Sequence, residues 1–210
     1  MEKLETTLIK HTKYIYEYTN VLDDKSLDRI RTTLTHECIE KNHPNMSRIK
    51  NSRDNDAYIL GKLKNDNQII FDINNELENL GYEYLKKYYS DCPLINRYYK
   101  PHGMVGSAMT YRVYGENDQY NWHVDTDGRF NLLVSFLLYL NDDFDGGHTK
   151  FLNDRLKVSP KKGSVLMFPC GPYFLHKSTP IKSGIKHVVW NCYMDYPKGF
   201  IEALEGLADK

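Results

Sequence analysis

The sequence predicts an α+β fold in which a mainly β core is backed by helices from the N-terminal half. Three observations predict it. Apolar residues recur at three- and four-residue steps in two segments of the first half. From about Met104 onward, short β-rich runs alternate with turn signals. One of these runs, Leu132–Tyr139, is apolar enough to be buried on both faces. Several short strands at this spacing suggest a sandwich, a jelly roll or a barrel.

Two amphipathic helices are expected in the N-terminal half. The first lies within Leu22–Glu40, where aspartates near the start can cap a helix and apolar side chains recur at one-turn intervals from Leu27 onward. The second lies within Asp72–Asp91, which repeats the same spacing until Pro93 interrupts it. The polar segment between them, residues 43–58, is expected to form a loop.

Five β-rich runs follow the helices, separated by turn signals such as DFDGG and SPKKG. They are Ser107–Tyr114, Phe130–Asn141, His148–Asn153, Ser164–Cys170 and Lys186–Tyr196. In the second run, alternate side chains point to opposite faces of a strand. One face carries Leu132, Val134, Phe136 and Leu138, and the other carries Leu133, Ser135, Leu137 and Tyr139. We expect the helices to cover the wholly apolar face and a cavity to lie against the face with hydroxyls.

The length and composition favour one globular domain. A chain of 210 residues with 40% apolar and 27% charged residues can bury an ordinary core. We expect residues 1–210 to form a single domain. In it, residues 1–103 would supply mostly helical support and part of the substrate side, residues 104–196 the β core, and residues 197–210 a C-terminal tail or short helix.

The net charge and the arrangement of the cysteines indicate which classes of partner and which cellular compartment to expect. Lys+Arg and Asp+Glu both number 28, and nucleic-acid-binding proteins usually carry a basic excess, so no nucleic-acid partner is expected. No apolar run has the length of a signal peptide core or a membrane span, so no membrane association is expected. The four cysteines form no C-x-x-C pair and fit free thiols in a reducing compartment. We therefore expect a cytoplasmic protein.

A His-x-Asp pair near the start of the β region is a candidate metal site. His123 and Asp125 are two residues apart, so on a strand they point to the same face. His176, which follows the strand SVLMFPC, is the candidate third ligand. Two histidines and one carboxylate on one face of an octahedron are typical of non-heme Fe(II) oxygenases. The same three ligands would also suit a Zn²⁺ site or a non-enzymatic, cupin-like metal-binding module.

A lysine ten residues after His176 completes the pattern. Lys186 follows a turn at Gly184 and shares one strand face with Val188 and Trp190. An ammonium group among apolar neighbours inside a barrel is costly unless it meets an anion. A solvated lysine at the edge of a strand is the alternative.

The segment Tyr111–Tyr196 resembles the catalytic core of the Fe(II)- and 2-oxoglutarate-dependent dioxygenases, most closely the prolyl 4-hydroxylase-like group. The stretches that carry the resemblance occur in the order of the family: YGENDQYNWHVD, VSFLLYLND, GGHTKF and VSPKKGSVLMF, followed by His176 and Lys186. Five ordered matches make the resemblance specific, whereas the first hundred residues match only vaguely. Asn117 departs from the pattern, because the family often has glycine there.

The resemblance implies a double-stranded β-helix, which is a variant of the jelly roll, and a set of site residues. Fe(II) would be bound by His123, Asp125 and His176. 2-Oxoglutarate would chelate the iron and extend its far carboxylate to Lys186, helped by hydroxyls of Tyr114, Thr149 and Tyr139, while O₂ takes the remaining coordination position. Trp190 would wall the pocket, or would be an ordinary core aromatic. These residues are the candidate catalytic and cofactor-binding groups.

The resemblance also implies the reaction. An unactivated C–H bond would be hydroxylated while 2-oxoglutarate is decarboxylated to succinate, with ascorbate as a candidate reductant. A protein or peptide substrate with a peptidyl-proline is the first expectation, and a lid is expected at Tyr98, Tyr99 and the loop to Gly106. A free amino acid, another protein side chain and a small molecule are alternatives, and a nucleobase is the weakest of them. The sequence predicts no oligomeric state.

Overall fold

The computed structural model describes residues 5–43, 52–65, 67–93, 104–126, 132–152 and 155–195. The tail expected at residues 197–210 lies outside the described residues, and so do Tyr98 and Tyr99 of the expected lid. Across the described ranges, no helix combines the length and apolarity that a bilayer crossing requires.

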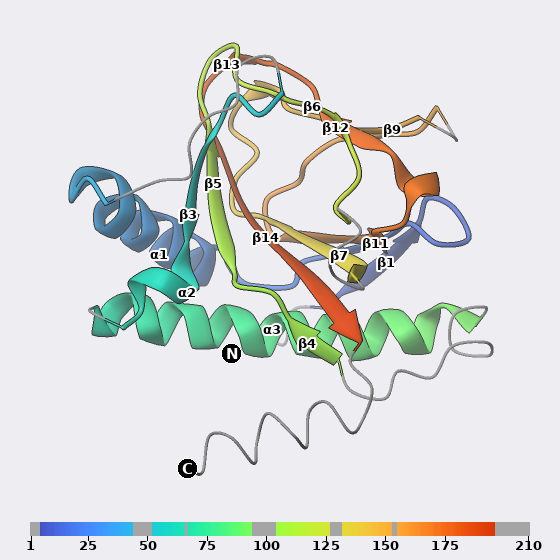
Figure 1. Ribbon diagram of the computed structural model, residues 1–210, viewed down its shortest axis with the longest axis horizontal. Coiled ribbons are helices and arrows are strands. Elements are labelled where there is room, and N and C mark those ends of the chain that lie inside the picture. The colour runs from blue at the N-terminus through green and yellow to red at the C-terminus, as the bar shows by residue number, and fades with distance from the viewer. Residues whose placement is uncertain are drawn as a thin grey trace.

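An antiparallel sheet of eight strands is the larger layer of the described structure (Figure 1). Its strand order is β1-β2-β11-β7-β14-β5-β3, and β4 pairs with the far end of β14. The strands are β1 (Thr7–Lys10), β2 (Tyr16–Thr19), β3 (Asp56–Ile59), β4 (Met104–Gly106), β5 (Thr110–Tyr114), β7 (Leu132–Tyr139), β11 (Ser164–Pro169) and β14 (Lys186–Asp195). The two longest strands, β7 and β14, lie side by side at its centre.

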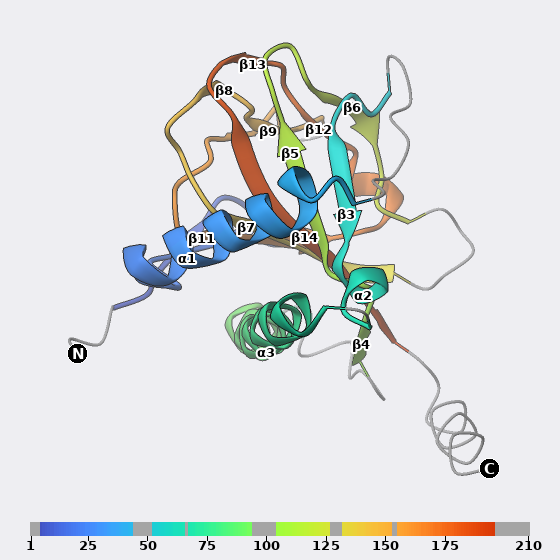
Figure 2. The same ribbon diagram turned by 90° about the vertical axis from the view of Figure 1, so that its left-hand side faces the viewer.

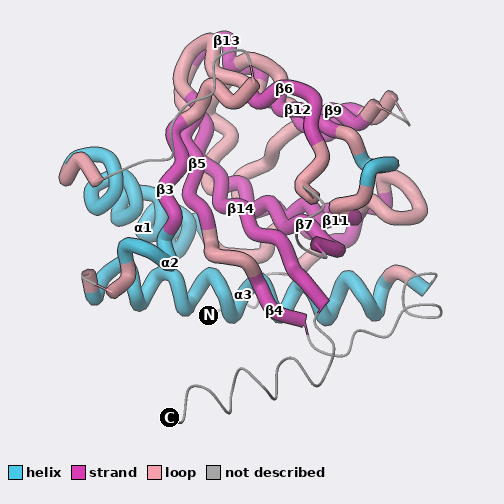
Figure 3. The backbone as a smooth tube through the Cα atoms, viewed as in Figure 1, coloured by secondary structure: helices cyan, strands magenta, loops and turns pink. Residues whose placement is uncertain are grey.

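A smaller antiparallel sheet faces the large one, in the order β10-β9-β12-β6. Its strands are β6 (Tyr120–His123), β9 (Thr149–Phe151), β10 (Lys157–Val158) and β12 (His176–Ser178). A short pair joins the two layers at one end and consists of β8 (Asp145–Gly146) and β13 (Ile181–Ser183). Figure 3 shows strands forming most of this body, with helices confined to its outside. The expected mainly β core is confirmed, and two facing antiparallel sheets are the architecture of a double-stranded β-helix.

Helices lie on the outer face of the large sheet, away from β6, β9 and β12 (Figures 1 and 2). They are α1 (Asp24–Leu34), which continues as a π-helix (Thr35–Glu40), α2 (Leu60–Leu63) and α3 (Gln68–Asp91). A 3₁₀ turn (Pro172–Phe174) lies apart from them, between β11 and β12. The Asp23 side chain caps α1 by accepting the backbone N–H of Ser26 at 2.7 Å. The side chain of Asn67 caps α3, which therefore begins four residues before the expected start at Asp72.

The large sheet buries its outer face against these helices, as expected from the central strand. Val134, Phe136 and Leu138 of β7 pack in one cluster with the apolar stripes of α1 and α3. Burying each such side chain contributes about 1.5–3 kcal/mol. Leu133 departs from the expected alternation because β7 has a bulge at this position. Successive residues of β14 pair with Val134 and Leu132, so Leu133 has no partner in the register. Leu133 consequently packs against the helix-side cluster instead of the cavity.

The expectation of a mostly helical first half is incomplete. β1 and β2 form a hairpin that extends the large sheet through β11, and β3 adds a strand beside β5. β3 occupies the end of the segment that was expected to be a loop. Each of these strands has only four residues, which is too short for a period-two pattern to stand out from the surrounding sequence.

Candidate active site

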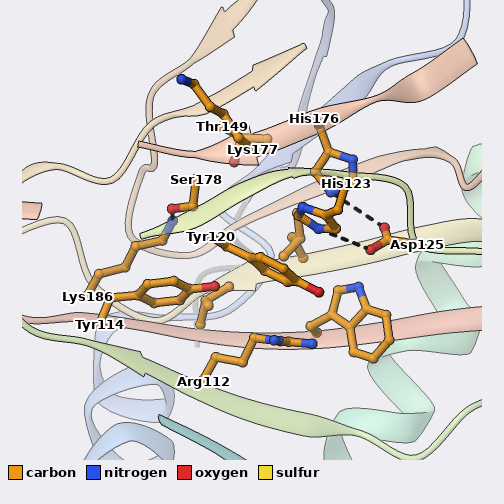
Figure 4. Close-up of a pocket in the computed structure, with 13 residues that line it drawn as sticks. Arg112, Tyr114, Tyr120, His123, Asp125, Thr149, His176, Lys177, Ser178 and Lys186 are labelled. Atoms are coloured by element: carbon orange, nitrogen blue, oxygen red, sulfur yellow. Dashed lines mark hydrogen bonds and ion pairs between the residues drawn. The ribbon is translucent and has the colours of Figure 1, made fainter. Parts of the chain in front are cut away.

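Three potential metal ligands converge between the two sheets. His123 ends β6, Asp125 follows two residues later, and His176 opens β12. β6 and β12 are antiparallel neighbours, and His123 pairs directly with His176 across them. One nitrogen from each imidazole and one oxygen of the carboxylate all lie within 4.8 Å of one another (Figure 4). Strand pairing therefore brings together ligands that are far apart in the sequence.

Backbone carbonyls fix the orientation of both imidazoles. The Nδ1 atom of His123 lies 2.7 Å from the carbonyl oxygen of Asn121, and that of His176 lies 3.0 Å from the carbonyl oxygen of Phe174. A carbonyl oxygen can only accept, so each Nδ1 carries the hydrogen and donates it. Each Nε2 is left with a lone pair, 3.6 Å (His123) and 3.7 Å (His176) from the Asp125 carboxylate. This tautomer is the one in which Nε2 can bind a metal.

The carboxylate of Asp125 is held by β7. The hydroxyl of Ser135, from the middle of that strand, donates to Asp125 Oδ2. Burial alone would raise the pKa of the Asp125 carboxyl, but the adjacent His176 and His123 and the Ser135 hydroxyl hold that pKa well below its usual range. Burial lowers the pKa of the His176 imidazole below its usual value. A charged carboxylate and a neutral imidazole are the states that bind a divalent cation.

Aromatic rings restrict the two histidines further. Tyr120 stacks on His123 with ring centroids 3.6 Å apart and planes 10° apart. Phe168 meets His176 edge-on at 4.8 Å. These contacts leave each imidazole little rotational freedom, so the nitrogens are in place before a metal binds.

A buried ammonium group lies in the same cavity. Lys186 is 3% exposed, and its Nζ donates to the carbonyl oxygen of Gly147 at 2.7 Å and to the hydroxyl of Ser178 at 3.1 Å. The rings of Tyr114 and Tyr139 lie 5.1 Å and 5.4 Å from Nζ. Among the described residues, no carboxylate pairs with this ammonium. One of its three N–H groups thus has no partner there, and its charge has no counter-ion.

The pairing of β14 with β5 in the large sheet determines which side chains form one wall of the cavity. Lys186 of β14 lies opposite Tyr114 of β5, and Val188 lies opposite Arg112. Because side chains alternate, Lys186, Val188 and Trp190 share the inner face, as expected from the sequence. All of these side chains line the cavity together with the metal-ligand candidates.

Residues 109–195 match the family model of the 2OG-Fe(II) oxygenase superfamily, and the match includes the converging triad and the buried lysine. This segment is a 2OG-Fe(II) oxygenase domain. The resemblance noted in the sequence is confirmed.

Known proteins similar to this chain carry prolyl hydroxylase names. A putative prolyl 4-hydroxylase of Acanthamoeba polyphaga mimivirus is 39% identical over 64 residues, which cover 27% of this chain and 26% of that protein. The viral collagen prolyl hydroxylase of Paramecium bursaria Chlorella virus-1, in its 2OG complex, superimposes with a TM-score of 0.63 at 19% identity, over 87% of this chain and 97% of that one. A prolyl hydroxylase of Trichoplax adhaerens, solved with a hypoxia inducible factor peptide fragment, gives a TM-score of 0.61 at 16% identity, over 88% and 84% of the two chains. The two solved structures establish the shared fold.

The side chains of the oxygenase domain fit Fe(II) and 2-oxoglutarate, the cofactors of the superfamily, which act with O₂. Two neutral imidazole nitrogens and one carboxylate oxygen are the donor set of non-heme Fe(II) sites. The Lys186 ammonium, buried without a counter-ion among the described residues, is the partner that a dicarboxylate requires. His123, Asp125 and His176 could therefore hold the metal, and Lys186 the far carboxylate of 2-oxoglutarate.

The other residues expected to contact 2-oxoglutarate differ in their positions. Tyr114 and Thr149 line the cavity beside Lys186. The hydroxyl of Tyr139 is bonded to that of Thr149 at 2.8 Å, so Tyr139 lies behind Thr149 and presents its ring to Lys186. Trp190 also lines the cavity and lies against the Arg112 guanidinium instead of Lys186.

Besides Lys177, sequence reasoning missed two residues of this cavity that the strand pattern could have identified. Ser178 contacts the Lys186 ammonium, and Arg112 lines the wall beside Trp190. The signal was alternation along a strand: Ser178 lies two residues after His176, and Arg112 two residues before Tyr114. Each missed residue thus shares a strand face with a residue that was identified.

The buried ammonium gives a testable pH dependence. Burial lowers the pKa of Lys186 from 10.5 to about 7. The unfolded chain keeps this proton up to the ordinary pKa, so it binds more protons than the folded protein between these two values. In the protein without 2-oxoglutarate, this difference should make the free energy of unfolding rise with pH between about pH 7 and pH 10. Urea titrations across this pH range should show the rise in wild type but not in Lys186→Met. If the free energy of unfolding depended on pH equally in both proteins, the lowered pKa would not belong to Lys186.

Gly147 explains the GGHT turn and supplies a second prediction. It has φ +60°, and its carbonyl oxygen accepts a hydrogen bond from the Lys186 ammonium. A Cβ there would lie 2.6 Å from Ile181 and 3.1 Å from the Lys186 stem. Gly147→Ala should lower the free energy of unfolding by about 1–3 kcal/mol and weaken 2-oxoglutarate binding. Gly171→Ala is the matched control, because Gly171 has φ −63° and a Cβ there meets nothing within 4 Å. Chemical denaturation and calorimetry measure both quantities, and equal effects of the two substitutions would exclude a special role for Gly147.

Proposed function

We propose that the protein is an Fe(II)- and 2-oxoglutarate-dependent dioxygenase that hydroxylates an unactivated C–H bond and converts 2-oxoglutarate to succinate. One observation carries the proposal: two oriented imidazoles, one carboxylate and one buried ammonium line a single cavity. When bound, Fe(II) and 2-oxoglutarate together supply the activation of O₂. A metal-binding module without activity would leave the buried Lys186 charge without a purpose.

The protein side chains have separate roles in this proposal. His123, Asp125 and His176 hold the metal, and the backbone carbonyls and Ser135 keep their lone pairs directed at it. Lys186 binds the far carboxylate of 2-oxoglutarate by charge, with hydroxyls of Tyr114 and Thr149 lining the same end of the cavity.

We propose peptidyl-proline as the substrate. The prolyl hydroxylase names of the similar proteins support it. The cavity also supports it, because Tyr120 and Trp190 line it, and extended proline-rich peptides bind aromatic-lined grooves. A free amino acid, another protein side chain or a small molecule with the same chemistry is the alternative. We also infer a reducing, cytoplasmic setting from four cysteines that are all free and buried.

The test is succinate formation by the purified protein. With Fe(II), 2-oxoglutarate, O₂ and ascorbate, the protein should form succinate, and an array of proline-containing peptides should contain members that raise the rate and gain the mass of one oxygen atom. Failure to form succinate under any of these conditions would exclude the dioxygenase. Succinate formation without modification of any proline peptide would exclude the peptidyl-proline substrate and leave the chemistry intact.

A further inference from the structure

Arg112 is a buried cation in the cavity that the roles above do not use. It lies in the middle of β5, opposite Val188 of β14, and its side chain points to the inner face that also carries Tyr114. The residue is 6% exposed, although arginine is almost never buried without a partner. Figure 4 shows its side chain running beneath Tyr114 and Tyr120, with Lys186 at the other end of the cavity.

Two aromatic rings flank the guanidinium without satisfying it. Its Cζ atom lies 4.9 Å from the ring centroid of Trp190 and 5.4 Å from that of Tyr120. Within the described ranges, its Nη1 atom is buried and has no hydrogen-bond partner, and no carboxylate forms an ion pair with it. Cation–π contacts offset only part of the cost of burying a charge. The guanidinium is planar and has an N–H donor group without a partner among the described residues. Such a group is well suited to donate to a carboxylate or carbonyl oxygen.

The position of the guanidinium indicates which ligand brings that oxygen. Arg112 contacts the ring of Tyr120, and Tyr120 stacks on the metal-ligand candidate His123. The contacts of Lys186 are a different set, formed by Gly147, Ser178 and the rings of Tyr114 and Tyr139. The two cations therefore have separate sets of contacts, and Arg112 is linked through Tyr120 to the metal-ligand candidate His123.

We propose that Arg112 is a substrate-binding residue that donates to a carbonyl or carboxylate oxygen of the residue that is hydroxylated. The inference rests on the proposed function and narrows its substrate class to compounds with such an oxygen. In a peptide with an internal proline, the oxygen is that of a backbone carbonyl. In a peptide that ends in proline, or in free proline, it is that of the α-carboxylate, whose charge also matches the guanidinium.

The test compares Arg112→Gln and Arg112→Lys with the control Arg31→Gln, which removes the same charge from α1 on the far side of the sheet. Loss of a charge-assisted hydrogen bond should raise the KM of Arg112→Gln for the peptide substrate about tenfold to a hundredfold. Arg112→Lys should recover part of this loss, since it keeps the charge without the planar guanidinium. The Kd of 2-oxoglutarate, measured by calorimetry on the Mn(II)-loaded protein without peptide, should stay within about twofold of wild type in all three variants.

Two results would overturn the assignment. One is that Arg112→Gln has the same KM for the peptide as wild type. The other is a Kd for 2-oxoglutarate that rises in parallel with KM, which would place Arg112 in the cosubstrate site. Failure of the proposed function is separate, because wild type would then form no succinate at all.

A further experiment uses only the wild-type protein, so its outcome does not depend on whether a variant folds. A peptide whose proline carbonyl is replaced by a methylene group should bind at least about tenfold more weakly than the parent peptide. Equal binding would contradict the role of Arg112. Comparison of the same peptide ending in proline as the free acid and as the amide, alongside free proline, then identifies which source of the oxygen the guanidinium prefers.

Discussion

Asp125→Ala is expected to abolish succinate formation. The carboxylate is the only anionic ligand of the triad, is buried against Ser135, and faces both Nε2 atoms. Its removal leaves two neutral imidazoles, which bind a divalent cation much more weakly. We expect the affinity for Mn(II), used in place of Fe(II), to fall by well over a hundredfold, because groups that only support metal ligands already contribute about 10–100-fold. Calorimetry measures this affinity, and a succinate assay measures turnover.

The same result is expected for His123→Ala, since His123 ends β6 and pairs directly with His176 of β12. Asp72→Ala, on the exposed face of α3, is the control for removal of a carboxylate and should match wild type in both assays. Normal succinate release from Asp125→Ala or His123→Ala would remove these residues from the metal site.

Lys186→Ala is expected to raise the Kd of 2-oxoglutarate by about a hundredfold to a few thousandfold. Breaking a buried ion pair by removing one partner costs about 3–5 kcal/mol, and each tenfold corresponds to about 1.4 kcal/mol. Lys186→Arg should also bind poorly, because the larger guanidinium has no room beside Gly147 and Ser178.

Lys186→Met separates binding from folding. It keeps the length of the stem and removes the buried charge, so the protein without 2-oxoglutarate should be at least as stable as wild type while its 2-oxoglutarate affinity is lost. Lys182→Ala is the control, since its ammonium is exposed and pairs with Asp145 at the surface. A 2-oxoglutarate Kd in Lys186→Met equal to that of wild type would show that the far carboxylate binds elsewhere.

Local patterns predicted the parts of the fold that recur with a fixed period. The alternation of β7 placed Phe136 toward the helices and Ser135 toward the cavity, and both lie there. The face shared by Lys186 and Trp190 follows from the same period of two, whereas Asp125 lies beyond the end of β6 and reaches the site from the bend that follows the strand. Asn117, where the family often has glycine, adopts φ +66°, which asparagine tolerates better than most residues.

Sequence patterns could not predict features that depend on tertiary pairing. The strands β1, β2 and β3 are stabilised by their neighbours in the sheet, and four residues carry too little pattern to be recognised alone. The role of Arg112 depends on two rings, one from β6 and one from β14, that only the folded sheets bring together. An arginine within a β-rich run is by itself indistinguishable from one at an exposed strand position.

A crystal structure of the protein with Mn(II) and 2-oxoglutarate under anaerobic conditions tests the proposed site most directly. We expect one metal ion bound by Nε2 of His123, Nε2 of His176 and the carboxylate of Asp125. We also expect 2-oxoglutarate to chelate that ion, with its far carboxylate on the Lys186 ammonium. A metal held without one of these three side chains, or a 2-oxoglutarate whose far carboxylate avoids Lys186, would contradict the proposed site.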